Sequence, residues 1–284
     1  MTTGGNVILA WTAMAAVMVT AGMAQAQAQD SDGVDTVAVT SEAFTPDPLA
    51  AVVPFGPGEY LRYKLKIGPL NAGTGFMAVR GIDTVRGHPT YHIQMGMKGS
   101  PLFGAVRVDD LYESWLDTRQ LVSRRYVKDV HMNDYEKYKA FEIYPEDGYW
   151  ERTDEDKFDD LPTALPLDEI AFVYFIRTLP LEVGETYMFN RYFKKEGNPV
   201  VIKVLRKEVK EVPAGTFNTI VIQPIIQTSG LFSEGGEAEL YFTDDEDRYL
   251  VYMRTKLPIF SMTLHLEEVT RGVPIHTQGL QPGH

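Results

Sequence analysis

The sequence predicts an all-β fold: mostly an antiparallel meander that forms a curved or barrel-like sheet, lipocalin-like at most, with one short central helix. In segment after segment, apolar and polar residues alternate with the period of a β-strand. Short groups of turn residues separate these segments and leave no room for the helical crossovers that parallel strands require. Only one stretch has helical spacing. Whether the sheet closes into a barrel or stays open is not decided by the pattern.

Residues 1–28 are typical of a secretory signal peptide. No Asp, Glu, Lys or Arg precedes Asp30, and residues 7–24 form an almost unbroken apolar run. The small-residue pattern at 24–28 fits cleavage after Ala26 or Ala28. No Lys or Arg stands ahead of the run, and its length is at the lower limit for a spanning helix, so an uncleaved membrane anchor is the alternative.

Residues 29–54 are acidic, small and proline-bearing, which predicts a flexible linker. A single β domain is expected over 55–271, followed by a disordered tail over 272–284. The net charge of −12 lies entirely after the signal, and the chain contains no cysteine. We therefore expect an exported, periplasmic protein that has no disulfides and is not a lipoprotein. Its acidity argues against a nucleic-acid partner, and no integral membrane domain is expected after signal cleavage.

The clearest strand is predicted over 60–67, where Leu61, Tyr63, Leu65 and Ile67 share one face and the basic residues share the other. A turn is expected over 68–73. Further strands are predicted over 91–97, 187–192, 200–204, 217–227, 237–242, 249–257 and 259–269. Turn residues are found at 86–89, 146–148, 196–199 and 244–247.

Residues 166–179 predict the one helix. Ile170, Val173, Tyr174 and Arg177 recur at helical spacing, and acidic residues stand where a helix N-terminus favours them. Pro180 is expected to end the helix. A single helix in a meander could plug or cover one end of the curved sheet.

No motif assigns a reaction. Thiol chemistry is excluded without cysteine, no G-x-S-x-G motif or phosphate-binding glycine loop occurs, and Ser100 and Ser229 lie in turn-like surroundings. Pairs of carboxylates for glycoside hydrolysis remain possible, because their separation is spatial. We name no catalytic residue and no cofactor, and we favour a non-catalytic protein while leaving enzymatic activity open.

No metal site is assigned either. His88 and His92 have the spacing of a helical zinc site, but here they precede a predicted strand. The acidic runs at 154–160 and 244–247 could supply calcium ligands, but neither has the spacing of an EF-hand loop. Solvated hairpin turns explain both runs.

Aromatic residues are abundant, with 15 Tyr and 14 Phe. If the sheet curves around a cavity, inward-facing aromatic and methionine side chains would line an apolar pocket with a few polar groups. Ordinary core packing is the alternative for each residue. The candidate ligand-binding residues are Tyr63, Tyr91, Met95, Tyr112, Trp115, Tyr126 and Arg177.

Five segments, in order along the chain, resemble the exported bacterial family of unknown function DUF3108. They are FGPGEYLRY at 55–63, the helix ending in FIR at 175–177, LEVGE at 181–185, VPAGTFNT at 212–219 and ELYFTDD at 239–245. The resemblance covers about residues 55–270 and departs at Phe242, where the family often has Trp. It implies export and a β architecture, but it offers no catalytic residues to transfer to this chain.

We weigh three functions. The first is a non-catalytic envelope protein that binds a lipid-like apolar or amphipathic ligand inside the curved sheet. The second is an envelope interaction or assembly factor that has a solid core and acts through its surface. The third is a hydrolase that uses carboxylates or a metal. The expected partner is accordingly a lipid-like ligand or another envelope protein.

Overall fold

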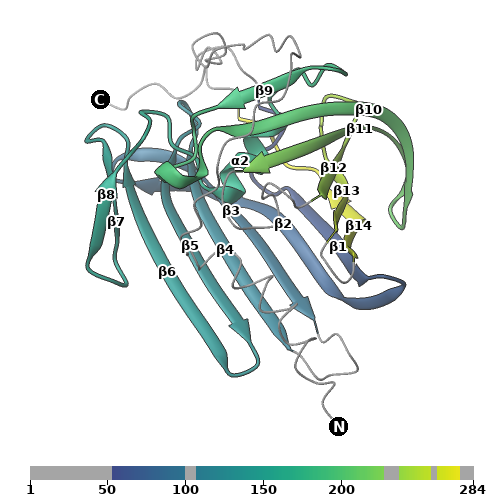
Figure 1. Ribbon diagram of the computed structural model, residues 1–284, viewed down its shortest axis with the longest axis horizontal. Coiled ribbons are helices and arrows are strands. Elements are labelled where there is room, and N and C mark those ends of the chain that lie inside the picture. Colours follow the sequence, from purple (N-terminus) through teal and green to yellow (C-terminus); the bar gives the residue numbers. More distant parts are fainter. Residues whose placement is uncertain (1–52, 100–106, 227–236, 257–260, 276–284) are drawn as a thin grey trace, which may run out of the picture.

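A single curved sheet of antiparallel strands makes up most of this computed structural model, which describes residues 53–99, 107–226, 237–256 and 261–275 (Figure 1). The strands are β1 (Tyr60–Ile67), β2 (Leu70–Val85), β3 (His88–Gly99), β4 (Val108–Asp117), β5 (Ser123–Met132), β6 (Tyr135–Tyr144), β7 (Tyr149–Arg152), β8 (Lys157–Asp160), β9 (Thr186–Phe189), β10 (Val200–Val212), β11 (Gly215–Ile226), β12 (Glu237–Thr243), β13 (Leu250–Lys256) and β14 (Ser261–Thr270). The helices are α2 (Glu169–Ile176) and the short 3₁₀ helix η2 (Lys195–Gly197). The predicted fold class is confirmed.

The sheet consists of two meanders joined along the first and last strands. Strands β1 to β8 follow one another in one direction, and β14 back to β9 follow in the other. β1 pairs with β14 from Tyr60–Thr270 to Ile67–Met262. β8 and β9 are the two ends of the strand order, so the sheet is curved but unclosed.

Alternation along each strand separates a concave, buried face from a convex, solvated face. On β5, the side chains of Arg124, Tyr126 and Lys128 are buried, whereas Arg125 and Asp129 lie on the other face. Such alternation fixes the register, because a slip by one residue would exchange the two faces.

Helix α2 lies inside the curve of the sheet and packs against β3 and β4 (Figure 1). The helix is shorter than the predicted span of 166–179. Leu167 pairs in extended form with Tyr192, and Asp168 is the N-cap, so the helix begins only at Glu169. It is buried on nearly all sides, as a helix surrounded by protein must be.

The predicted turn over 68–73 is also too long: β2 already begins at Leu70 and pairs with β1 there. The strands predicted from the sequence do not include β4 to β8. The predicted signal peptide, nearly all of the predicted linker, Ser100, Ser229 and most of the predicted tail lie outside the described residues. Within the described parts, no helix has the length and apolar character needed to cross a membrane.

Candidate functional site

An apolar cavity lies between the N-terminal half of α2 and the concave face of the sheet. Its volume is about 70 Å³, and its wall is almost entirely apolar. Strands from both meanders contribute to it, together with Ile170 and Val173 of the helix. The other side chains lining it are Tyr63, Phe76, Met77, Met95, Met97, Tyr112, Tyr126, Glu169, Leu240, Leu250, Met253, Met262 and Leu264.

Two buried polar atoms at this cavity have no hydrogen-bond partner among the described residues: the Tyr126 hydroxyl and Glu169 Oε2. The other carboxylate oxygen, Oε1, accepts hydrogen bonds from Lys128 Nζ at 2.7 Å and from the Tyr192 hydroxyl at 2.8 Å. Burying a polar group without a partner costs free energy, so such atoms mark a place where a ligand or water can be accommodated.

Hydrogen bonds to Asp168 fix the position of Glu169. Asp168 caps the helix by accepting from the backbone amides of Ile170 and Ala171, both at 2.9 Å. Its second oxygen accepts from the hydroxyls of Ser114 on β4 and Ser123 on β5, at 2.6 and 2.7 Å. The helix N-terminus is thereby tied to the sheet beside the cavity.

Lysines surround Glu169 on the concave face. Burial alone would raise the pKa of Glu169, but the charges of Lys128 and Lys194, together with the hydrogen bonds from Lys128 and Tyr192, outweigh it and hold that pKa at about 2. Burial lowers the pKa of Lys194 to about 8, and the nearby charges of Lys128 and Lys139 act in the same direction. The carboxylate is therefore ionised in a basic environment.

Lys194 also lies among aromatic rings. Its ammonium is 4.4 Å from the ring centroid of Phe141, 4.8 Å from that of Phe193 and 5.6 Å from that of Trp150. Such cation–π contacts favour the protonated form of the lysine.

Arg177 lies at the opposite end of the helix, away from the cavity, where its hydrogen bonds hold the helix end in place. Its guanidinium donates to both carboxylate oxygens of Glu59, at 2.6 and 2.8 Å, and both side chains are buried. It also donates to the backbone oxygens of Pro54 and Asp247. This pair joins the C-terminal end of α2 to the residue that precedes β1.

Two other candidate residues lie away from the cavity wall. Tyr91 packs in the core, with its ring centroid 5.3 Å from that of Phe55. Trp115 lies on the convex face, where it stacks on His92 at 4.6 Å and donates to an Asp83 carboxylate oxygen at 2.9 Å. The structure thus brings together only Tyr63, Met95, Tyr112 and Tyr126 around the cavity.

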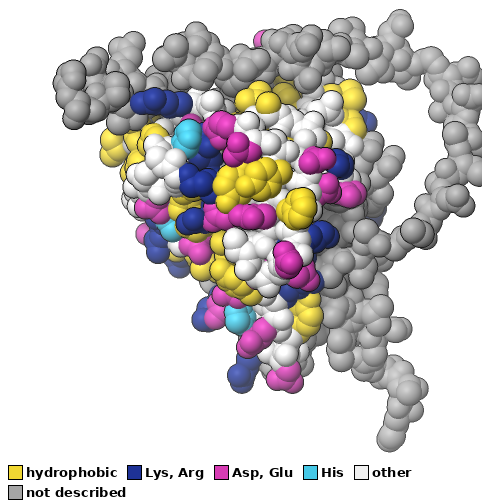
Figure 2. Space-filling view, turned by 90° about the vertical axis from the view of Figure 1, so that its left-hand side faces the viewer, with side chains coloured by type: hydrophobic (Ala, Val, Ile, Leu, Met, Phe, Trp, Pro, Cys, Tyr) yellow, Lys and Arg dark blue, Asp and Glu magenta, His cyan; other side chains and the backbone are white. Residues whose placement is uncertain are grey.

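The convex face of β4, β5 and β6 carries a shallow hollow of about 330 Å³ lined by Leu111, Trp115, Val127 and Tyr138, among others. Tyr138 is 55% exposed. Figure 2, viewed from the side of β6 to β8, shows hydrophobic side chains flanked by charged ones.

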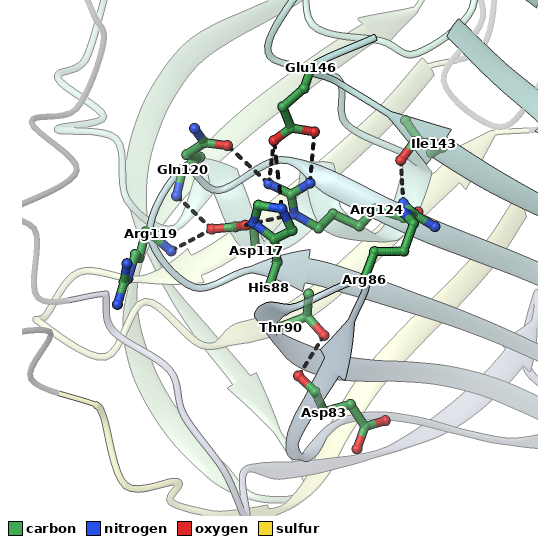
Figure 3. Close-up of polar contacts among 10 residues, drawn as sticks. All are labelled: Asp83, Arg86, His88, Thr90, Asp117, Arg119, Gln120, Arg124, Ile143 and Glu146. Carbon is green, nitrogen blue, oxygen red and sulfur yellow. Dashed lines mark hydrogen bonds and ion pairs between the residues drawn. The ribbon is translucent and has the colours of Figure 1, made fainter. Parts of the chain in front are cut away.

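A charged network holds the ends of β3 to β6 together (Figure 3). The buried Arg124 donates to Asp117 at 2.7 Å and to both oxygens of Glu146, and these bonds lower the pKa of Glu146 to about 2. His88 lies 3.5 Å from Asp117. The network therefore fits a structural role.

Carboxylates of the acidic run at 154–160 form ion pairs with basic side chains. Asp154 and Glu155 pair with Arg152, and Asp159 pairs with Lys195. Over the described residues, no group of three or more His, Asp or Glu side chains is arranged to hold a metal ion.

Sequence reasoning missed Met77, Met253 and Met262 in the cavity wall and the lysines beside it. The alternation of side chains along a strand could have predicted the lysines. Lys128 is two residues after Tyr126, and Lys139 is two residues before Phe141. A lysine in phase with a buried aromatic residue faces the same side of the sheet.

A family model matches most of the chain. The family described as "Protein of unknown function (DUF3108)" matches residues 62–267, which confirms the resemblance seen in the sequence. None of the curated proteins searched matches the chain.

Among solved structures, a β-barrel-like protein of domain of unknown function DUF1849 from Brucella abortus aligns with a TM-score of 0.51 and 12% identity. The alignment covers 77% of this chain and 99% of that one, and at such identity it shows the fold alone. A protein described as a candidate lipoprotein from Parabacteroides distasonis aligns with a TM-score of 0.31, 12% identity and coverage of 78% and 99%. A protein described as a candidate exported protein with a YmcC-like fold, from Bacteroides fragilis, aligns with a TM-score of 0.28, 9% identity and the same coverage.

Proposed function

The chain belongs to the DUF3108 family, and with that established we propose that it is an exported, non-catalytic protein of the cell envelope that binds a lipid-like ligand on its concave face. The signal-like residues 1–28 support export. The open, curved sheet supports binding, because its concave face lies between two unjoined edges, β8 and β9.

The observation that carries the proposal is the chemistry of the cavity wall. Five methionines, three tyrosines and several leucines surround it, and only Tyr126 and Glu169 present partnerless polar atoms. Ligand sites for apolar molecules have this composition: a hydrophobic wall with a few polar groups that orient the ligand.

The cavity of about 70 Å³ is smaller than the roughly 300–1,000 Å³ of ordinary ligand sites. Binding of a whole lipid therefore requires side chains of the wall to move. Methionine suits this requirement, because its unbranched, polarisable side chain has three rotatable bonds and adapts to irregular surfaces.

The proposal is tested by expressing the whole chain, purifying the exported protein, and recording native and denaturing mass spectra. We expect a stoichiometric lipid-sized adduct that denaturation releases. The denatured mass should also correspond to cleavage after Ala26 or Ala28.

A matched pair of glycine variants on β2 locates the ligand. A Cβ at Gly75 would lie 3.3 Å from the Gly96 carbonyl oxygen, 3.7 Å from Met97 Cγ and 3.8 Å from a Leu264 methyl, so Gly75→Val places a side chain at the cavity wall and requires a small adjustment of β3. A Cβ at Gly81 meets nothing within 4 Å, which makes Gly81→Val the control. We expect the adduct in the wild type and in Gly81→Val but not in Gly75→Val. A clean unliganded mass for the wild type would contradict the proposal.

The convex face favours a second candidate function, that of an interaction or assembly factor. In the hollow, Tyr138 is exposed, and Leu111 and Trp115 are half-buried beside charged side chains. If the wild type carries no ligand, this role becomes the better supported one. Cross-linking in the envelope, with Tyr138→Glu as the disruptive variant, would then test it.

A further inference from the structure

The concave face carries a group of positive charges beside the apolar cavity. Lys128 and Lys139 are direct cross-strand partners on β5 and β6, and Lys194 interacts electrostatically with both. Like charges directly opposite each other in a sheet are destabilising, so their placement here requires a compensating partner.

Glu169 is one such partner, but its single negative charge does not neutralise the lysines. It pairs with Lys128 at 2.7 Å. Within the described ranges, no salt bridge is found for Lys139 or Lys194. Lys139 and Lys194 therefore carry positive charge on this face without a described carboxylate at salt-bridge distance, although the whole chain has a net charge of −12.

These charges and the cavity wall share one row of cross-strand partners on the concave face. Cross-strand partners run in a single row from Met77 through Met95, Tyr112 and Lys128 to Lys139. Strands are about 4.8 Å apart, so Met95 and Lys139 are about 14 Å apart along the sheet. The row changes from apolar to basic within that distance.

We propose that the ligand is an anionic amphiphile, whose carboxylate or phosphate group binds Lys139 and Lys194 while its apolar chain enters the methionine-lined cavity. This inference rests on the proposed function and specifies its ligand class. Charge complementarity supports it, because an anion between two lysines that lack carboxylate partners removes their repulsion. Lys128 is already engaged, because its ammonium and the Tyr192 hydroxyl both donate to Glu169 Oε1.

Isothermal titration calorimetry with three probes tests the inference on the purified protein. Dodecyl phosphate carries both parts, dodecyl maltoside carries the same chain with a neutral head, and inorganic phosphate carries the anion alone. We expect dodecyl phosphate to bind about tenfold or more tightly than either of the others. In the variant Lys139→Gln/Lys194→Gln, its affinity should fall to that of dodecyl maltoside, whose own affinity should not change.

The variant Lys203→Gln/Lys207→Gln removes the same charge from exposed positions of β10 and should bind dodecyl phosphate as the wild type does. Should the interior variant fail to fold, salt dependence replaces it. Raising NaCl from about 0.05 to about 0.5 M should weaken the binding of dodecyl phosphate but not that of dodecyl maltoside.

Each remaining outcome decides a different point. Equal affinity of the two amphiphiles, unaffected by the lysine variant, overturns the headgroup inference and leaves the proposed function intact. If neither amphiphile binds, both are overturned. If inorganic phosphate binds as tightly as dodecyl phosphate, the lysines form a site for a free anion and the amphiphile assignment is wrong.

Discussion

Lys139 shows how much the environment of one side chain can determine. It lies on the concave face of β6, in the same row as Lys128 and in phase with the buried Phe141. Burial lowers its pKa to about 8, and the charges of Lys137 and Lys128 act in the same direction, against the opposing effect of Glu169. Unlike Lys194, it has no described ring contact that would favour its protonated form.

This lowered pKa predicts a pH-dependent stability. Above about pH 8 the folded protein loses the proton of Lys139, whereas the unfolded chain keeps it to about pH 10.4. Between these values the unfolded state binds more protons, so this lysine makes the free energy of unfolding rise with pH, and its penalty is fully present below about pH 8. We expect Lys139→Met to raise the free energy of unfolding at pH 7, and to raise it by less at pH about 10, as measured by urea denaturation. The same gain at both pH values would show that Lys139 titrates normally.

Helix α2 is the element that joins the interior to the sheet at both of its ends. Asp168 fixes the N-terminal end through Ser114 and Ser123, and Arg177 fixes the C-terminal end through Glu59. Between these ends the helix lies inside the curve, and the cavity lies beside its first turns.

The Glu59–Arg177 pair predicts a large cost when one partner is removed. In Glu59→Gln, Arg177 would remain buried without its counter-charge, and breaking a buried ion pair typically costs about 3–5 kcal/mol. We expect the free energy of unfolding to fall by about that amount in urea denaturation.

The matched control is Glu268→Gln, which removes the exposed partner of Arg62 and should cost less than about 1 kcal/mol. Equal effects of the two substitutions would mean that the buried pair does not hold the helix in place.

The molecule as a whole depends on the contact between its first and last strands. β1 and β14 pair along their whole length, although about 200 residues separate them in the chain. Each meander ends at one free edge, β8 or β9, and the two share the core around α2. Neither can bury its concave face without the other.

We therefore expect the two meanders to unfold together. Trp115 and Trp150 both lie in the first meander, so their fluorescence follows β1 to β8, whereas far-ultraviolet circular dichroism follows all strands. The two signals should change at one common denaturant midpoint, as in a two-state transition. A second dichroism step without a change in fluorescence would show that β9 to β14 unfold separately.

The sequence alone determined several local elements of this protein, because period-two alternation and turn residues act over short distances. The strands at 60–67 and 91–97, the hairpin turn at 146–148 and the presence of one helix before Pro180 all follow from that pattern. Family membership also followed from short segments in a fixed order.

Only the tertiary structure decided which residues meet. Tyr91, Trp115, Tyr112 and Tyr126 were all candidates for the same reason, that they are aromatic residues. Tyr112 and Tyr126 line the cavity, whereas Tyr91 lies in the core and Trp115 lies on the convex face. The open sheet, the helix inside it and the row from Met77 to Lys139 all depend on pairing between distant strands. Local patterns cannot contain this information, because curvature and cross-strand neighbours arise only when the whole sheet assembles.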